Sequence, residues 1–525
     1  MSLIHAPILT AAQMRAVDSA TIRDEPIASI DLMERAATAC VDWLLTHLPD
    51  NTRYHAVCGM GNNGGDGLAI TRLLLERGHS THAYLIDYGA PISADAQINL
   101  QRLQAIAPTQ IHTIRLANDL PTLSANNDKN DSPICSIDAL LGTGTARTAE
   151  GLLAHVITTL NQLSTADGVH TVAIDLPSGL LSDAHTPANW PAIHATHTLT
   201  FECAKPALLW AENAERVGAW QTLPIGLSQK AIAAANSPMQ LVTAEWVHTQ
   251  HKPRGKFSHK GIFGHALLIA GAHGTVGAAI LAARACLRGG AGLLTVHSPQ
   301  CAYVPLQTAI PEAMVQTDTH ERLWRDAIEI EKYDAIGIGC GIGQAAETRA
   351  ALRTLLQTIA ARADAPRLIL DADALNILAS EPDLFKLLPP NTILTPHPKE
   401  FERLVAHLSL DTTTDAQRHQ AQLTLAQHYN IIVVLKGAYT CTALPDGRSF
   451  YNTTGNPGMA KGGSGDALTG MILAQLAQGY APDVAAILGV YLHGAAGDAA
   501  AQKYGQRAML PSDLIECLGV LDTHY

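Results

Sequence analysis

The sequence predicts an α/β protein with two domains, each built on a mainly parallel β-sheet. Three observations support this class. Short apolar segments alternate with longer amphipathic segments along the chain, as expected for strands and helices in succession. Several of the short segments end in glycine-rich or acidic loops, which is typical of the carboxyl ends of parallel strands. The alternation restarts after residue 264, so the 525 residues are divided between two sheets.

Composition excludes several classes of partner. The chain has 35 Lys and Arg against 47 Asp and Glu, a formal charge of −12, and no basic run, so neither nucleic acid nor an anionic membrane surface is expected as a partner. The apolar stretches are interrupted well short of the roughly 20 residues that a membrane span needs. The N-terminus lacks a secretory pattern and the nine cysteines include no CxxC pair, which favours a reducing cytoplasm over a disulfide framework or a zinc site.

The first half begins with two amphipathic helices, expected within residues 10–48 and separated near Pro26. A strand at 54–58 leads into the glycine loop 59–67, GMGNNGGDG, and a helix is expected over 68–77. Strand, glycine loop and helix in this order form the geometry in which a parallel sheet binds phosphate. The spacing is neither a dinucleotide GxGxxG nor a P-loop. The loop's side-chain oxygens also suit a cation or sugar hydroxyls, and a plain tight turn is the alternative.

Strand and helix signals continue at 82–86, 94–105, 134–141, 152–163, 171–174 and 198–203. Two more strand ends carry polar loops, at 138–147 and 175–179. Because ligands lie outside the carboxyl ends of strands in a doubly wound sheet, we expect the three loops to form one site. Arg147 is a nearby cation that suits a phosphate, with an exposed helix start as its alternative role. Lys205 follows the last strand and is expected at the same edge.

A change of composition between residues 228 and 255 separates the halves, and we place the domains at 1–238 and 239–525. The second half opens with a strand at 265–270, a glycine loop at 271–277 and a helix at 278–288. Further strands are expected at 293–297, 335–338 and 368–370, and two more end in the polar segments 395–400 and 436–440. This pattern predicts a second parallel sheet with its loops on one edge.

A glycine-dense turn at 455–465 closes the second half and runs directly into an apolar helix at 467–477. Its consecutive glycines expose N–H groups at a helix N-terminus, so the turn predicts an anion hole. Asp466 either caps free N–H groups or accepts a proton from a hydroxyl held beside a phosphate. The strand end at 436–440 and a hairpin around Asp446 and Gly447 provide a platform for an adenosine. His397 is expected on the substrate side, with a satisfied core histidine as the alternative.

Taken together, these segments resemble known families. The first half resembles the NAD(P)H-hydrate epimerases, which have a Rossmann-like fold, through GNNGGDG, DALLGTG and DLPSG. The second half resembles the ADP-dependent NAD(P)H-hydrate dehydratases of the ribokinase-like superfamily through GTVGAAILAARACLRGGAGL, GCGIG, DADALN, TPHPKEF, KGAYT and GNPGMAKGGSGD. The motifs cover nearly the whole chain in the order of the bifunctional NAD(P)H-hydrate repair enzymes.

The resemblance implies repair of hydrated NADH and NADPH, which exist as R and S forms of NAD(P)HX. The epimerase half would interconvert the two forms. The dehydratase half would use ADP to phosphorylate the S form and release phosphate, which restores NADH or NADPH and leaves AMP. Potassium is implied in the epimerase, and phosphoryl transfer implies magnesium with the nucleotide. The expected partners are NAD(P)HX and ADP, in a cytoplasmic homo-oligomer.

The resemblance also assigns site residues. In the epimerase half the substrate contacts are Asn62, Asn63, Gly64, Gly65, Asp66, Gly142, Thr143, Gly144, Thr145, Ala146, Arg147, Thr148 and Asp175. Asp175 is the catalytic residue, and potassium is assigned to Asn63, Asp138 and Ser178. In the dehydratase half the substrate contacts are Gly277, Ala278, Gly341, His397 and Asp466, with Asp466 as the base. The nucleotide contacts are Lys436, Gly437, Ala438, Tyr439, Thr440 and Gly465.

Two positions depart from the family pattern. Lys399 stands where glycine is expected, and Lys461 stands where a small residue is frequent. We interpret Lys461 as added positive charge for a phosphate and Lys399 as a side chain that narrows the substrate mouth. Neither change removes a predicted catalytic group.

Two other functions fit parts of the sequence. A kinase of a small hydroxymethyl or vitamin-like alcohol shares the GxGD helix start and the nucleotide platform, and would favour ATP and release a stable phosphorylated product. The GNNGGDG domain argues against it, since such a kinase has no evident use for an epimerase. A sensing or scaffolding protein would bind a dinucleotide without turnover, and the intact Asp175 and Asp466 argue against that function.

Overall fold

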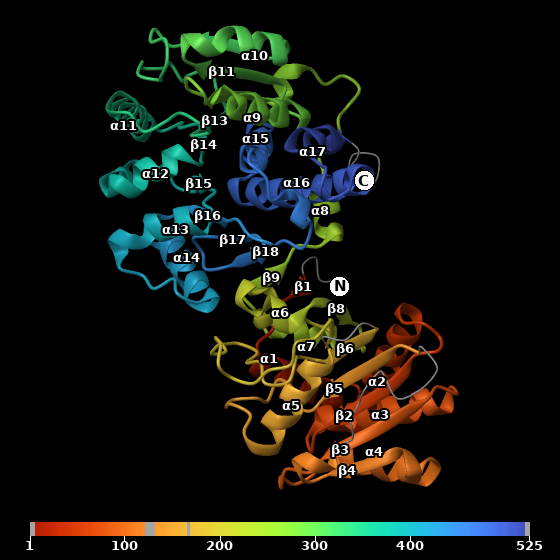
Figure 1. Ribbon diagram of the computed structural model, residues 1–525. Helices are drawn as coiled ribbons and strands as arrows, with labels where there is room; N and C mark the ends of the chain where they lie inside the picture. Colours follow the sequence, from red (N-terminus) through yellow and green to blue (C-terminus); the bar gives the residue numbers. More distant parts are fainter. Residues whose placement is uncertain (1–5, 121–131, 165–167, 520–525) are drawn as a thin grey trace. The chain divides into compact units, whose positions relative to one another are not determined.

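The structure is a computed structural model and describes residues 6–120, 132–164 and 168–519. It contains two compact units (Figure 1): Pro7–Ser237 make up most of the first, and Pro238–Thr413 with Gln417–Tyr525 make up most of the second. Each unit has its own β-sheet and its own hydrophobic core. The α/β class with two parallel-sheet domains, predicted from the sequence, is confirmed.

The first unit is a doubly wound parallel sheet. The strands found among its described residues have the order β4-β3-β2-β5-β6-β7-β8 and are all parallel. The strands are β2 (Arg53–Cys58), β3 (Thr81–Ile86), β4 (Ile111–Ile114), β5 (Ile134–Ala139), β6 (Val169–Ile174), β7 (His197–Phe201) and β8 (Ala219–Leu223). The helices are α1 (Ala11–Asp24), α2 (Ser29–His47), α3 (Asn62–Glu76), α4 (Ala94–Ile106), α5 (Gly151–Leu163), α6 (Ala214–Val217) and α7 (Gln229–Ala234).

The strand order of this sheet reverses between β2 and β5, which is where an open parallel sheet binds ligands. The loops after both strands therefore open toward one crevice, as the sequence predicted. The edge strands β4 and β8 were not predicted. In β4 only one of four residues is buried, so it lacks the continuous apolar pattern that identifies the central strands.

The helix after β2 begins earlier than the sequence analysis predicted. It starts at Asn62, so Gly64 and Gly67 lie inside its first two turns instead of in a loop. A Cβ at Gly64 would lie 1.9 Å from the carbonyl oxygen of Gly59, and one at Gly67 would lie 2.6 Å from Cβ of Ala139. These glycines therefore allow the helix to pack closely on the sheet, and our interpretation of them as loop formers was wrong.

The second unit has a larger, mixed sheet. From β9 onward the strand order is β9-β18-β17-β16-β15-β14-β13-β10-β11-β12, and only β17 runs antiparallel to its neighbours among the described strands. The predicted hairpin around Asp446 and Gly447 joins β17 and β18. The strands are β1 (Ala6–Pro7), β9 (Met239–Leu241), β10 (His265–Ile269), β11 (Leu293–Ser298), β12 (Met314–Thr317), β13 (Ala335–Ile338), β14 (Arg367–Leu370), β15 (Ile393–Leu394), β16 (Ile432–Leu435), β17 (Cys441–Ala443) and β18 (Ser449–Tyr451).

Helices cover this sheet on both sides of the strand plane (Figure 1). They are α8 (Ala244–Gln250), α9 (Val276–Arg288), α10 (Tyr303–Ala309), α11 (Ala346–Ala360), α12 (Asp373–Ser380), α13 (Pro398–Val405), α14 (Asp415–Tyr429), α15 (Ser464–Ala477), α16 (Pro482–Tyr504) and α17 (Pro511–Cys517). One core cluster lies under α9, α15 and α16, and another lies under α11, α12 and α13.

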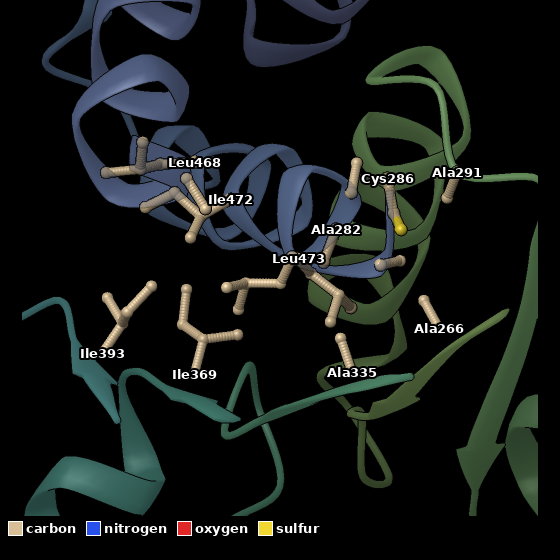
Figure 2. Packing of buried hydrophobic residues seen from close by; sticks show 14 of the residues in the cluster. Ala266, Ala282, Cys286, Ala291, Ala335, Ile369, Ile393, Leu468, Ile472 and Leu473 are labelled. Carbon is tan, nitrogen blue, oxygen red and sulfur yellow. The ribbon is translucent and has the colours of Figure 1, made fainter. Parts of the chain in front are cut away.

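The helix α15 is enclosed by its neighbours. Every residue from Ala467 to Ala477 is buried. Figure 2 shows Ile472 and Leu473 of α15 over Ile369 of β14, with α9 alongside. Gly470 allows α9 to approach, because a Cβ there would lie 2.0 Å from the carbonyl oxygen of Ala282. The helix that carries the predicted anion hole is therefore fixed to both the sheet and α9.

The helix α16 was not predicted, and it changes one conclusion from composition. Among the described residues it is the one helix long and apolar enough to pass a length-and-composition test for a membrane span, with a mean hydropathy of 1.3. The prediction that every apolar stretch is too short to span a membrane is therefore wrong by that test. However, 67% of the apolar window is buried inside the protein, and α16 packs against α15 and α17. It is a core helix of the second unit.

Candidate active sites

The carboxylate of Asp175 lies directly after β6 and is held by a buried lysine. Asp175 has a φ of 65°, a conformation that costs a non-glycine residue about 1–3 kcal/mol and is concentrated at functional sites. Its Oδ1 accepts a 2.6 Å hydrogen bond from Nζ of Lys205. The same ammonium donates to Oγ1 of Thr200 and to the carbonyl of Phe201. Lys205 is fully buried, whereas 17% of the Asp175 side chain is exposed. The buried ammonium therefore holds the carboxylate of Asp175 in place while part of that side chain remains accessible from the crevice.

Two more carboxyl groups, Asp18 of α1 and Asp66 of α3, lie close enough to Asp175 to sense its charge. Burial raises the pKa of Asp66 well above its usual range, and Asp175 raises it further. Burial and the charge of Asp175 raise the pKa of Asp18 to about 6, while Lys205 lowers it. The crevice therefore holds two carboxyl groups whose pKa values are raised, which suits proton exchange. Asp18 was not predicted as a site residue, because it lies on an ordinary amphipathic helix that is far from the glycine loops in the sequence.

The three residues assigned to potassium meet around Leu141. The side-chain amide of Asn63 donates to the carbonyl of Leu141 at 2.8 Å, and the N–H of Leu141 donates to Oγ of Ser178 at 2.8 Å. Asp138 is fully buried and accepts hydrogen bonds from the N–H and the hydroxyl of Ser178. Burial raises the pKa of Asp138 to about 6, although the bonds from Ser178 lower it.

This donor set fits a monovalent cation. It combines carboxylate, hydroxyl, amide and carbonyl oxygens, and a cation there would offset the charge of a carboxylate that has no cationic partner in the described structure. No group of three His, Cys, Asp or Glu side chains suited to a metal ion occurs in residues 6–120, 132–164 and 168–519.

The remaining epimerase residues lie on α3 and on the loop after β5. Asn62 is exposed at the α3 N-terminus, whereas Gly64 and Gly65 are buried within the helix. Gly142 packs on Asn63, since a Cβ at Gly142 would lie 3.4 Å from Cβ of Asn63. Thr145 closes a turn by donating its N–H and hydroxyl to the carbonyl of Gly142. The other loop residues are exposed or half-buried: Thr143, Gly144, Ala146, Arg147 and Thr148.

In the second unit, Lys436 forms a buried ion pair beside the N-terminus of α15. Its Nζ lies 2.9 Å from Oδ1 of Asp371 and 3.9 Å from Oε2 of Glu400. The other oxygen of Asp371 accepts a 2.6 Å hydrogen bond from Thr469. Burial lowers the pKa of Lys436, but the two carboxylates outweigh it and raise the pKa above its usual range. Nζ also lies 3.4 Å from the Cβ position of Gly465, so a fixed positive charge adjoins the predicted anion hole.

Asp466 occupies the first turn of α15, after an N-cap at Gly463 with φ of 98°. Burial raises the pKa of Asp466, a hydrogen bond from Cys340 lowers it, and the charge of Asp371 raises it. A raised pKa makes the carboxylate a better proton acceptor near neutral pH. The first-turn N–H groups of a helix have no intrahelical acceptor, so donors and base lie together at this helix end. This arrangement is suited to removing a proton from a hydroxyl while a phosphate is held.

His397 begins α13 and is not a core histidine. Its side chain is 47% exposed, and its Nε2 lies 3.5 Å from Oε1 of Glu400. The carboxylate of Glu400 accepts the N–H of His397, and the N–H of Glu400 donates to Nδ1 of the ring. The alternative of a satisfied core histidine is therefore wrong. The contact with Glu400, which also faces Lys436, brings His397 to the same edge of the sheet.

Three further predicted substrate contacts lie where α9 begins. Gly277 is exposed and Ala278 is half-buried, both in the first turn of α9. Gly341 follows Cys340 and has a φ of 67°, and its carbonyl accepts a 2.7 Å hydrogen bond from Oγ1 of Thr275. The loops after β10 and β13 are thus tied together at the carboxyl edge of the sheet.

The predicted nucleotide platform is a turn after β16. The hydroxyl of Thr440 donates to the carbonyl of Gly437 at 3.1 Å and accepts the N–H of Gly437 at 3.3 Å. Gly437 and Ala438 are exposed, and Tyr439 is half-buried. The backbone of this turn is therefore accessible next to Lys436.

Lys461 does not serve as added phosphate charge. Its Nζ donates to the carbonyls of Arg507 and Met509 at 2.8 and 2.5 Å, so it fastens the glycine turn to the segment before α17. Lys399 is exposed in the first turn of α13. Asp371 and Glu400 belong to the motifs DADALN and TPHPKEF, but no role was predicted for either residue. Position in the sequence was the one feature that could have identified them. Asp371, for example, directly follows β14, at the edge of the sheet where ligands bind.

Comparisons with known proteins agree across both units. A family described as YjeF-related protein N-terminus matches residues 29–207, and a family described as NAD(P)H-hydrate dehydratase matches residues 266–519. The bifunctional NAD(P)H-hydrate repair enzyme of Moorella thermoacetica is 36% identical over 530 residues, covering 97% of this chain and 96% of the relative. The enzyme of the same description from Escherichia coli is 35% identical over 494 residues, covering 93% and 88%.

Two solved structures resemble the second unit. A ribokinase-like superfamily protein from Enterococcus faecalis is 31% identical, with a TM-score of 0.47, and covers 55% of this chain and 96% of that one. An ADP/ATP-dependent NAD(P)H-hydrate dehydratase from Bacillus subtilis, co-crystallised with ATP and Mg²⁺, is 33% identical, with a TM-score of 0.47, and covers 54% and 98%. Because the two relatives are 36% and 35% identical to this chain over almost its full length, the chain belongs to the family of bifunctional NAD(P)H-hydrate repair enzymes.

Proposed function

We propose that this chain repairs hydrated NADH and NADPH by two reactions. The first unit interconverts R and S NAD(P)HX, and the second unit dehydrates S-NAD(P)HX with ADP to give NAD(P)H, AMP and phosphate. Family membership supports both reactions. The observation that carries the second is the meeting of Asp466, the α15 N-terminus and the ion-paired Lys436 at one edge of the sheet.

In the dehydratase reaction, Asp466 accepts the proton of the hydroxyl on the hydrated ring. The hydroxyl oxygen bonds to the β-phosphorus of ADP, and the bond from that phosphorus to the bridging oxygen breaks, so AMP leaves with the electron pair. The original bond between the ring carbon and this oxygen then breaks, and phosphate leaves with the electron pair. Loss of a ring proton restores NAD(P)H. The α15 N–H groups and Lys436 offset the phosphate charge throughout, and such positioning and charge stabilisation dominate phosphoryl transfer.

A magnesium ion fits this site through the nucleotide. Both oxygens of Asp371 are engaged, by Lys436 and by Thr469, and the carboxylate of Glu400 accepts the N–H of His397. Mg²⁺ commonly binds through substrate phosphates, waters and one or two carboxylates, so the phosphates of the nucleotide would provide most of its ligands. The ion would supply further neutralisation of phosphate charge.

In the epimerase reaction, one bond at the hydrated ring carbon breaks and re-forms on the opposite face, and no group is transferred. We assign to Asp175 the exchange of a proton with the substrate in both directions. Lys205 is the positioning residue that holds its carboxylate, and the α3 N-terminus lies where the phosphates of the dinucleotide would bind.

Potassium should stabilise the first unit, and more strongly at high pH. Because burial raises the pKa of Asp138 to about 6, the folded protein keeps a proton that the unfolded chain loses near pH 4, so stability falls as pH rises from about 4 through 6. Potassium beside Asp138 favours the ionised form and removes that loss. We expect K⁺ to raise Tm at pH 8 by several degrees, about 2–4 °C for each kcal/mol recovered, and to have little effect at pH 5.

The measurement is thermal unfolding in KCl, NaCl and choline chloride at equal ionic strength. Asp138→Asn should respond equally to all three salts. An equal rise of Tm in choline chloride would show that ionic strength acts alone, and that potassium has no site here.

The proposed function is tested by recovery of reduced-nicotinamide absorbance from a mixed R/S NADH hydrate with ADP, with ATP and without nucleotide. We expect full recovery with ADP, and one AMP and one phosphate for each NADH formed. Recovery of the S share alone would contradict the epimerase. No recovery, with a stable phosphorylated alcohol formed from another substrate and ATP, would favour the kinase.

We also propose a cytoplasmic location and a homo-oligomeric state. The location is supported by the nine cysteines, which are all free and, except for Cys301, all buried. The oligomeric state is measured by light scattering of the full chain.

A further inference from the structure

The helix α16 holds both ends of the glycine turn. Near the start of the turn, the carboxylate of Asp498 accepts the N–H of Gly455 at 2.8 Å and the side-chain amide of Asn456 at 2.9 Å. At the end of the turn, Nε2 of His493 lies 3.0 Å from the carbonyl oxygen of Ser464. Neither α16 residue belongs to the sites described above.

Between these two points the helix backbone itself touches the turn. A Cβ at Gly494 would lie 2.3 Å from Oγ1 of Thr454, and one at Gly497 would lie 2.2 Å from Sδ of Met459. Thr454 also donates its hydroxyl to the carbonyl of Tyr491 at 2.9 Å. The turn therefore rests directly on α16 and has no space in which to shift toward it.

The chemistry of His493 fixes the direction of its hydrogen bond. The ring is 8% exposed, and burial lowers its pKa to about 4, so the imidazole is neutral at physiological pH. A carbonyl oxygen only accepts, so Nε2 carries the hydrogen and donates to Ser464. Ser464 is the first residue of α15 and lies two positions before Asp466. The contact thus acts on the helix turn that presents the phosphate donors and the base.

We propose that His493 and Asp498 are positioning residues of the dehydratase reaction. By fixing the two ends of the turn, they hold the N–H groups of Gly463, Gly465 and Asp466 and the carboxylate of Asp466 in the geometry that phosphoryl transfer requires. Displacement of a reacting group by about 1 Å is enough to cost roughly 100-fold in rate. The inference rests on the proposed ADP-dependent dehydration.

The Asp498→Asn variant tests the start of the turn. Its amide can accept only one of the two donors, and its NH₂ group would face that of Asn456 or the N–H of Gly455. We expect kcat for dehydration to fall roughly 10- to 100-fold and KM for ADP to rise, with KM for S-NADHX and the epimerase rate unchanged. The matched control is Asp483→Asn, which removes the same charge from the first turn of the same helix. It should behave as the unaltered protein.

The His493→Gln and His493→Leu pair tests the end of the turn. The Gln side chain retains an N–H donor near the position of Nε2, whereas Leu removes the side-chain donor to the carbonyl of Ser464. We expect the Gln variant to keep kcat within about threefold and the Leu variant to lose roughly 100-fold, with epimerase rates equal in both.

Other outcomes would overturn the proposal. If Asp498→Asn and His493→Leu lower Tm but keep wild-type kcat and KM for ADP well below the transition, α16 only stabilises the fold. If the His493→Gln and His493→Leu variants lose dehydratase activity equally, the hydrogen bond donated by His493 does not position the turn. If the unaltered protein shows no ADP-dependent dehydration, the proposed function is wrong. The epimerase assay and the control variant distinguish that result from one in which only the inference about His493 and Asp498 is wrong.

Discussion

Asp466→Asn should abolish dehydration and leave epimerisation intact. The substitution removes the proton acceptor at the α15 N-terminus while keeping the size of the side chain, and loss of a general base typically costs 10²- to 10⁴-fold, so we expect a loss of at least about 100-fold in kcat. The N–H groups of the first helix turn and Lys436 remain, so affinity for ADP should change by less than about threefold. The measurements are absorbance recovery from S-NADHX and ADP binding by calorimetry.

The first unit supplies the control for this variant within the same chain. Since the epimerase site lies on another sheet with its own core, its rate reports the amount of chain whose first unit is folded, and circular dichroism of the variant reports folding of the second unit. Asp364→Asn, at an exposed carboxylate paired with Arg362, should change neither activity. Near-normal dehydration by Asp466→Asn would remove Asp466 from the base role, and a loss of ADP binding instead of kcat would make it a nucleotide-binding residue.

Lys205→Met should produce the largest loss in the epimerase. The ammonium makes three hydrogen bonds in a fully buried position, and removing one partner of such a pair typically costs 3–5 kcal/mol, so we expect the first unit to lose about that much stability. Without this contact Asp175 is released from its fixed orientation. We expect epimerisation to fall by about 100-fold or more, with dehydration of S-NADHX unchanged.

The measurement is the rate of R to S conversion at a temperature at which circular dichroism shows the variant folded. Lys230→Met, at an exposed lysine of α7, is the matched control and should leave both the rate and the unfolding temperature unchanged. If Lys205→Met lowers the unfolding temperature but retains the epimerase rate, Lys205 supports the fold and does not position Asp175.

The sequence was most informative where local chemistry and strand position coincide. Asp175 and Asp466 each directly follow glycine or strand signals, and a carboxylate at the carboxyl edge of a parallel sheet has few structural roles. Lys205 was expected at the crevice from its place after β7. Its hydrogen bond to Asp175 was not, because pairing between side chains thirty positions apart depends on the packing of β6 against β7.

Other features were outside the reach of pattern reading. The early start of α3 depends on contacts of Gly64 and Gly67 with neighbouring backbone and side chains, and these contacts leave no periodic signal. The helix α16 is largely buried, and its apolar residues are spread around its circumference, so it lacks the amphipathic stripe that identifies surface helices. The role of His493 and Asp498 follows from where α16 lies in the fold.

The enclosure of α15 has a consequence for how the second unit opens. Since every residue from Ala467 to Ala477 is buried, the amide hydrogens of this helix exchange with solvent only when the whole unit unfolds. In the turn at 437–440, Gly437 and Ala438 are exposed, and the N–H of Gly437 is bonded to the hydroxyl of Thr440, so we expect these amides to exchange through small local openings. We therefore expect a nucleotide to meet one wall that is already in its final place and a second wall that can adjust when the nucleotide binds.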